Sequence, residues 1–140
     1  KGFNIEHALS CALGGFPSMR HNEVRDITAH MLRGVAYDVA VEPDLQPLTG
    51  EHFVHRTAIT GDSPRLDVAA SGVWGGRFER AFFDVRVFNP YARSNRNPAS
   101  LVSVYARHEK EKRRCYEARV LHIEHASFVH CVLSCTGGQG

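Results

Sequence analysis

The sequence contains no long apolar run and little cysteine. It has no stretch of about 18 or more apolar residues and no signal-peptide pattern, so nothing in it supports membrane insertion or secretion. The cysteines are few and widely spaced, which excludes a disulfide-rich scaffold and indicates a reducing compartment. We therefore expect an intracellular protein without a membrane partner. The cysteines are Cys11, Cys115, Cys131 and Cys135.

The sequence also lacks a strong excess of one charge. With 17 basic and 15 acidic residues its formal net charge is +2, so the overall balance does not by itself indicate a nucleic-acid-binding protein. The basic residues are nevertheless unevenly distributed. A cluster in the last third of the chain is either a solvated helix face or a surface that binds phosphates. It comprises Arg93, Arg96, Arg107, Lys110, Lys112, Arg113 and Arg114.

The length and the composition fit one globular domain. The 140 residues are 43% hydrophobic, which is enough to build one core, and no internal repeat or low-complexity segment divides them. The chain begins at Lys1 without an initiator Met, so we expect it to be a piece of a longer protein. Residues 1–16 contain a Gly-Gly pair and a nearby Pro and are expected to be a loop-rich lead-in. Residues 17–140 are expected to form the domain.

The pattern of apolar residues predicts a mixed sheet flanked by helices, an α/β or α+β fold. A helix is predicted over 18–33, with its apolar face formed by Val24, Ile27, Thr28, Met31 and Val35. Residues 65–71 and 80–88 are predicted to form an antiparallel hairpin. The remaining predicted elements are a strand at 35–43, an edge strand near 52–58, a helix at 101–118, and strands at 120–124 and 128–134.

Two aspartates in the predicted hairpin carry the strongest chemical signal. Asp67 lies in the first strand and Asp84 in the second, where alternation separates Asp84 and Arg86 from the apolar side chains. A carboxylate in an apolar strand requires a partner or a metal, and two carboxylates side by side would repel without a cation. The sequence therefore indicates a Mg²⁺ or Mn²⁺ site. The structural alternative pairs Asp84 with Arg86 or Arg65.

A lysine and a third acid complete the candidate site. Lys112 falls in the apolar and aromatic stripe of the 101–118 helix, whereas Lys110 falls on the opposite side, so Lys112 is expected to point inward. The alternative is that Lys112 extends from the edge of the core to solvent. Glu23 could supply a further carboxylate to the metal; it is otherwise a solvated residue or a partner of Arg20.

These residues stand in a series of motifs that resembles a known family. The motifs are HALSC, RHNEVRD, VEPDLQPL, RLDVAASG, FFDVRVFNP and YARHEKEKRRCYEARV. Together they span nearly the whole chain and resemble the restriction-like endonuclease domain of site-specific non-LTR retrotransposons, a member of the PD-(D/E)XK nuclease superfamily. The resemblance implies a domain of a larger reverse-transcriptase protein that nicks DNA in the nucleus, with DNA and the rest of that protein as partners.

The resemblance also assigns roles to residues of this chain. Asp67 and Asp84 would be the catalytic acids and metal ligands, and Lys112 the catalytic lysine. Glu23 would be the further catalytic acid and metal ligand that the family carries on a helix. Arg20 and His21 would contact DNA or organise the site. Apart from the resemblance, further DNA contacts are expected from basic residues elsewhere in the chain, namely Arg86, Arg93, Arg96, Lys110 and Arg113. His7 and Cys11 would be one half of a zinc knuckle whose other half lies before Lys1, so Zn²⁺ would be bound incompletely by these residues alone.

The sequence departs from the family pattern at three points. Leu66 replaces the Pro that precedes the first acid, Arg86 occupies the usual lysine position, and the interval from Asp67 to Asp84 is long. Because arginine is too basic to transfer a proton readily, a nucleic-acid-binding module that has lost cleavage remains open. A zinc-stabilised interaction domain is a further alternative, which rests on the nine histidines and four cysteines of the sequence.

Overall fold

The computed structural model describes residues 4–11, 13–46, 48, 64–95 and 100–138. Within them, β1 (Tyr37–Val41), β2 (Val68–Ser71), β3 (Arg80–Phe88) and β4 (Ser127–Ser134) form one sheet in the order β1-β2-β3-β4. β2 is antiparallel to both β1 and β3, and β4 runs parallel to β3. The predicted α+β class and the predicted hairpin are both confirmed.

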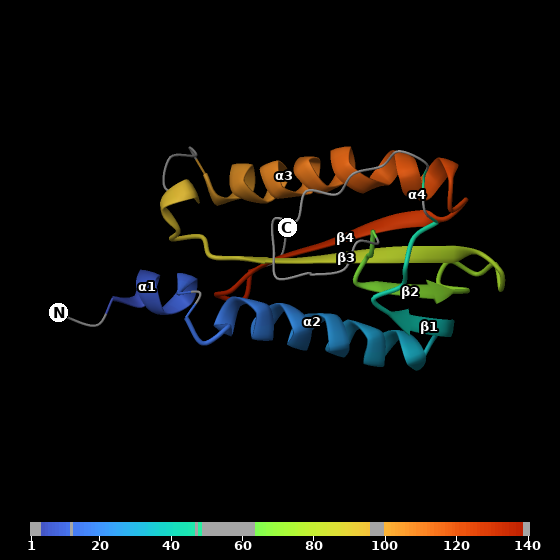
Figure 1. The fold of residues 1–140 in the computed structure, drawn as a ribbon, viewed down its shortest axis with the longest axis horizontal. Coiled ribbons are helices and arrows are strands. Elements are labelled where there is room, and N and C mark those ends of the chain that lie inside the picture. The colour runs from blue at the N-terminus through green and yellow to red at the C-terminus, as the bar shows by residue number, and fades with distance from the viewer. Residues whose placement is uncertain (1–3, 12, 47, 49–63, 96–99, 139–140) are drawn as a thin grey trace.

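Helices cover the two faces of this sheet (Figure 1). The helix α2 (Phe16–Arg33) lies along one face, and α1 (Ile5–Ser10) precedes it near the same end of the molecule. The opposite face carries α3 (Leu101–Lys112), a π-helical turn labelled η2 (Arg113–Glu117) and α4 (Ala118–His122). A short 3-10 turn, η1 (Arg93–Asn95), lies between β3 and α3. The result is a three-layer arrangement.

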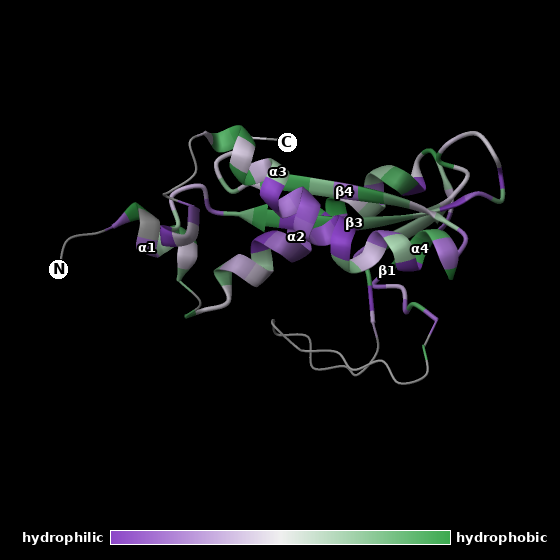
Figure 2. Ribbon diagram, turned by 90° about the horizontal axis from the view of Figure 1, so that it is seen from above, coloured by the Kyte–Doolittle hydropathy of each residue, from purple (hydrophilic) through white to green (hydrophobic). Residues whose placement is uncertain are grey.

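The core lies on both faces of the sheet, because strands between two helical layers bury both sets of alternating side chains. Ala29 and Leu32 of α2 pack against Val68 and Phe83 on one side. On the other side, Val120 packs with Phe82, Leu66, Leu45, Ala69 and Ala126, and a third cluster joins Phe88, Val104, Tyr105 and Val132. Figure 2 shows β3 and β4 as a largely hydrophobic centre between more hydrophilic helices.

The apolar face predicted for α2 is not the face that packs against the sheet. Ala29 and Leu32 are buried, whereas Ile27, Met31 and Val35 are more than half exposed. The inner face of α2 also carries two polar residues, His21 and Arg25, that make contacts beside the sheet. A count of large apolar side chains cannot identify such a face, because its members are small or polar.

Three other predicted elements differ from the structure. Residues 120–124 continue the helical segment to His122 instead of forming a strand, and the predicted loop-rich lead-in contains the helix α1. The predicted edge strand near 52–58 lies outside the described residues. None of the helices within the described ranges has both the length and the apolar character needed to cross a membrane.

The helical segment from Leu101 to His122 is continuous but not uniform. Ser100 caps its start, where the Ser100 hydroxyl oxygen accepts from the amide of Ser103 at 3.3 Å. The turn η2 begins directly after Lys112 and is π-helical, so its backbone hydrogen bonds span five residues instead of four. Single π turns within α-helices occur frequently at functional sites.

Candidate active site

Asp67 and Asp84 face each other across the β2–β3 hairpin. Val68 pairs with Phe83, and extending that antiparallel register by one residue places Asp67 opposite Asp84. The Asp67 amide donates to the Phe83 carbonyl at 3.2 Å, and Asp67 Oδ2 accepts from the Val85 amide at 2.6 Å. Asp67 is thus held against β3 at the point where β2 begins, and the hairpin brings the two carboxylates together.

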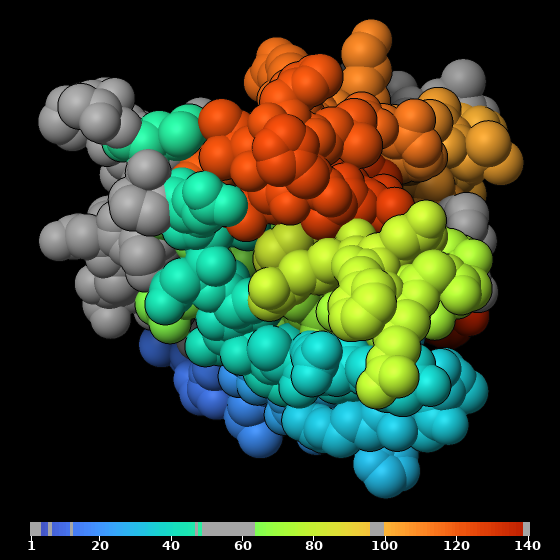
Figure 3. Space-filling view, turned by 90° about the vertical axis from the view of Figure 1, so that its right-hand side faces the viewer, coloured from blue at the N-terminus to red at the C-terminus, as the bar shows by residue number. Residues whose placement is uncertain are grey.

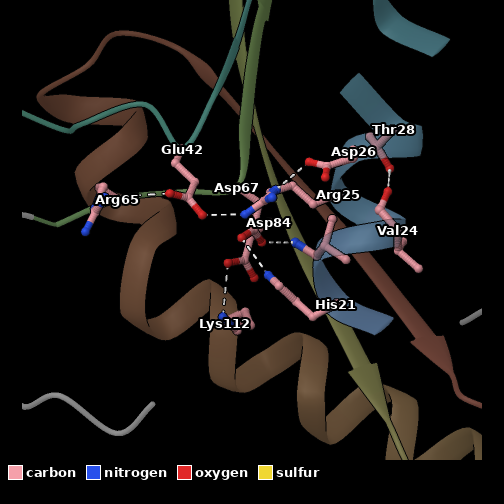
Figure 4. A network of polar contacts seen from close by, with 11 residues as sticks. His21, Val24, Arg25, Asp26, Thr28, Glu42, Arg65, Asp67, Asp84 and Lys112 are labelled. Atoms are coloured by element: carbon pink, nitrogen blue, oxygen red, sulfur yellow. Dashed lines mark hydrogen bonds and ion pairs between the residues drawn. The ribbon is translucent and has the colours of Figure 1, made fainter. Parts of the chain in front are cut away.

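Lys112 reaches this pair from the helical layer. Its Nζ atom lies 3.0 Å from Asp84 Oδ1, and the two residues form an ion pair between α3 and β3 (Figure 4). The same Nζ atom lies 5.5 Å from the centre of the Tyr116 ring, a distance typical of a cation–π contact. Lys112 is the last residue of α3, and its side chain is directed inward.

The Asp84 carboxylate is in an unfavourable environment for a charge. The residue is only 5% exposed, and its Oδ2 atom is buried without a hydrogen-bond partner among the described residues. Burial raises the pKa of the Asp84 carboxyl, and Asp67 adds to this effect, while the ammonium of Lys112 opposes it. One lysine therefore compensates this carboxylate only in part, and a further cation at Oδ2 would stabilise its charged form.

The helix α2 contributes His21 to the site. His21 Nε2 donates to Asp67 Oδ1 at 3.0 Å, so both oxygens of Asp67 have a hydrogen-bond donor. Hydrogen bonds of this kind fix the orientation of a carboxylate that ligates a metal. The sequence resemblance gave His21 a role in DNA contact or site organisation, and the structure places it within the site.

A second set of charges lies beside the acid pair and was missed in the sequence. Arg25 donates from Nε to Asp26 at 2.8 Å and from Nη1 to Glu42, whose other oxygen lies 3.6 Å from Arg65. The hydrogen bond with Asp26 raises the pKa of Arg25. The amide of Glu42 donates to the carbonyl of Asp67, so Glu42 is tied to the site through the backbone. Arg25 lies one helical turn after His21, so both residues fall on the same face of α2. That spacing is the sequence feature that could have identified Arg25.

The other two residues of the predicted α2 motif point elsewhere. Glu23 is exposed, and at about 100° per residue its position is roughly 200° around the helix from His21. α2 therefore directs Glu23 to solvent rather than to the aspartates. Arg20 donates from Nη2 to the Leu9 carbonyl at 2.5 Å, a contact that ties α1 to α2.

The residues predicted to contact DNA are spread over several elements. Arg86 follows Asp84 on the same face of β3, and its Nη2 atom lies 4.0 Å from Glu111. Arg113 pairs with Glu109 at 3.0 Å, one turn away on the helix. Lys110 and Arg93 are exposed, whereas Arg96 lies outside the described residues. The described cations therefore come from four elements, β3, η1, α3 and η2.

The candidate zinc half-site lies on α1 and its end. The Cys11 amide donates to the His7 carbonyl at 2.8 Å, so the two residues are one helical turn apart, and Cys11 is a free thiol. Two ligands are half of a structural zinc site. Among the residues that the structure describes, no group of three or more His, Cys, Asp or Glu side chains is arranged to hold a metal ion.

No model of a known protein family matches the chain, and no curated protein is significantly similar to it in sequence.

Proposed function

We propose that the chain is a metal-dependent endonuclease domain that nicks DNA, of the restriction-like kind that its motifs resemble. The observation that carries the proposal is the arrangement of Asp67, Asp84 and Lys112. Two carboxylates oppose each other where β2 begins beside the middle of β3, and a lysine from the next helix lies 3.0 Å from one of them. Such groups can promote hydrolysis of a phosphodiester, because they can position a cation and a water beside the phosphate.

The donor set fits Mg²⁺ or Mn²⁺ better than Zn²⁺. Mg²⁺ retains several water ligands and binds proteins through one or two carboxylates, so it does not need a third protein ligand. Asp67 and Asp84 would hold the ion. The buried Oδ2 of Asp84 has no hydrogen-bond partner in the part of the chain that the structure describes, so it is an oxygen that needs such a partner. When bound, the ion would increase the acidity of a water and offset the charge on the phosphate.

The chain's own residues would orient the reacting groups. His21 fixes one oxygen of Asp67 and the Val85 amide fixes the other, so that carboxylate cannot rotate freely. Lys112 would stabilise negative charge that develops on the phosphate, from a position set by Asp84 and Tyr116. Arg86, Arg93, Lys110 and Arg113 would contact phosphates, which gives an affinity that falls as salt increases. The domain would act in the nucleus, within a larger protein.

The direct test is nicking of supercoiled plasmid DNA in the presence of Mg²⁺ or Mn²⁺. We expect nicking by the wild-type domain and a loss of at least about 100-fold in Asp67→Asn and Asp84→Asn, because each substitution removes a carboxylate charge at the metal. Glu23→Gln is the matched control, since that carboxylate faces solvent. Equal nicking by Asp84→Asn and the wild type would contradict the proposal.

A binding module of the same fold is the second candidate. The observation that favours it is the Lys112–Asp84 ion pair itself, because a lysine can compensate a buried aspartate without any metal. Arg86 at the usual lysine position also favours a binding module, because arginine does not transfer a proton readily. This function predicts DNA binding that the Asp67→Asn variant retains, with no nicking under either metal.

The third candidate, a zinc-stabilised interaction domain, predicts bound zinc in the purified protein.

A further inference from the structure

The loop between β2 and β3, residues 72–79, presents aromatic rings to solvent. Phe78 is 91% exposed and Trp74 is 58% exposed, and Tyr37 of the neighbouring strand β1 is more than half exposed. In Figure 3 the lime-coloured residues of the hairpin stand out between α2 and the helical segment on the opposite face. Large exposed aromatic side chains gathered in one place are typical of a binding surface.

The loop is held in one conformation by the backbone. The Gly72 amide donates to the Glu79 carbonyl, and the Glu79 amide donates to the Gly76 carbonyl, both at 2.9 Å. Gly72 has a φ of +79°, and a Cβ at this position would lie 2.9 Å from the Tyr37 ring. The loop therefore presents its aromatic side chains from a closed turn, and binding would not require the turn to be ordered first.

Two arginines lie in the loop and directly after it. The Arg77 guanidinium lies 5.4 Å from the centre of the half-exposed Tyr37 ring, and that of Arg80 lies 5.1 Å from the ring of Phe82, which is buried. Both arginines are exposed, and the nearby Glu79 side chain lies against Gly76 within the turn. Stacking on an aromatic ring orients a guanidinium while its N–H groups remain free to contact anions.

From this juxtaposition we propose that the β2–β3 loop binds unpaired bases of a nucleic-acid strand. Trp74 and Phe78 stack on the bases, and Arg77 and Arg80 contact the neighbouring phosphates. Rings alone would suit a protein partner equally, but exposed rings in the same short segment as two exposed arginines match a polymer that alternates bases with phosphates. The proposal goes beyond cleavage, since binding at this loop needs neither the metal nor the acid pair.

The loop is connected to the acid pair by one strand. Arg80 begins β3, and Asp84 lies four residues further along it, a separation of about 13 Å at roughly 3.3 Å per residue. The loop and the acid pair are therefore separated by less than the length of a short oligonucleotide. This placement is consistent with one nucleic-acid ligand that contacts both regions.

The sole tryptophan of the chain provides a specific reporter, because Trp74 lies in the loop itself. We expect a short single-stranded oligodeoxythymidylate, added in EDTA so that no cleavage occurs, to quench Trp74 fluorescence and to bind more tightly than a duplex of equal length. Phe78→Ala should weaken binding by roughly 5- to 150-fold, the range for loss of one stacked base, whereas Phe78→Tyr should retain it. Val102→Ala removes another exposed apolar side chain, from α3, and serves as the matched control.

The outcomes separate this proposal from the nuclease proposal. Fluorescence anisotropy of the labelled oligonucleotide measures binding independently of Trp74. If the oligonucleotide binds without quenching, or if Phe78→Ala binds as tightly as the wild type, the loop does not contact bases and a protein partner becomes the better candidate. Absence of any DNA binding also overturns the proposal. Failure of nicking alone does not, because the assay requires no catalysis.

Discussion

The Nζ atom of Lys112 lies 3.0 Å from Oδ1 of Asp84, although the two residues are 28 positions apart in the chain. The contact joins the α3 layer to the middle of the sheet, where the Asp84 side chain is nearly inaccessible to water. Breaking a buried ion pair by removing one partner leaves the other charge uncompensated, which costs more than the pair contributes. This asymmetry makes the pair testable through stability as well as through activity.

We expect Lys112→Met to destabilise the domain by about 3 kcal/mol, because it leaves the Asp84 carboxylate buried without a cation. The measurement is the free energy of unfolding in urea at neutral pH. Lys110→Met, on the exposed side of the same helix, should change stability by less than about 0.5 kcal/mol. The double variant Asp84→Asn/Lys112→Met should recover most of the loss. Additive destabilisation in the double variant would show that the pair is not coupled.

Divalent metal should stabilise the folded domain through the acid pair. At a Mg²⁺ concentration about 100 times its dissociation constant, binding contributes about 2.7 kcal/mol, which raises the Tm by roughly 5–10 °C for a chain of this size. We expect this shift in the wild type and its loss in Asp67→Asn. Asp38→Asn makes the same charge change at an exposed position of β1 and should keep the shift. A thermal scan with and without Mg²⁺ decides between these results.

The stability of the domain should depend on pH through His108. The ring is buried against Phe88 at 4.7 Å between centroids, and burial, reinforced by Arg86 and Arg107, lowers the pKa of His108 to about 4. Between pH 6.5 and 4 the unfolded chain binds a proton at His108 that the folded chain does not. The free energy of unfolding should therefore fall as the pH decreases through this window, by about 3 kcal/mol in total.

The comparison with His108→Phe isolates this effect from the other titrating groups. The variant keeps an aromatic ring against Phe88 and removes two buried ring nitrogens that have no hydrogen-bond partner within the described residues. We expect its urea midpoint to change less between pH 6.5 and 4 than that of the wild type. Parallel pH profiles for the two proteins would show that His108 does not cause the loss.

Two glycines of the β2–β3 loop should respond differently to alanine. Gly75 has a φ of +99° with open space around it, so Gly75→Ala encounters only backbone strain, about 1–2 kcal/mol. Gly72→Ala adds a contact of 2.9 Å with the Tyr37 ring. We therefore expect a larger loss of stability in Gly72→Ala, measured by thermal unfolding, and a displaced Tyr37 ring. Equal losses would show that the ring can move aside without cost.

The hairpin and its two acids could be predicted from the sequence because they depend on local rules. Residues 83–87 alternate between apolar and charged side chains, and the observed β3 has the predicted bounds, Arg80–Phe88. Once the two runs are paired as a hairpin, Asp67 and Asp84 must come close together. The inward position of Lys112 follows from helical periodicity alone. In these cases the side-chain period of a strand or helix, together with the turn of the hairpin, determines where the residues lie.

The contribution of α2 could not be predicted in the same way. The sequence favoured Glu23 and the large apolar residues, whereas the structure turns His21, Arg25, Ala29 and Leu32 inward. That choice depends on the space and charge offered by β2 and β3, which are distant in the chain. The apolar residues 120–124 were ambiguous for a related reason, since a short apolar run fits a buried strand or a buried helix equally well.

The π turn that follows Lys112 should let this helix tolerate the deletion of one residue. A π turn holds one amino acid more than an α turn, so the helical segments before and after Arg113–Glu117 both keep their buried faces against the sheet despite the extra residue. Deleting the exposed Arg114 would convert the segment into an ordinary α-helix while leaving Lys112 and Val120 in place. Shortening a helix by one position normally rotates everything beyond it by about 100°. In this helix the deletion would instead remove the extra residue of the π turn, so the residues beyond it would keep their orientation toward the sheet.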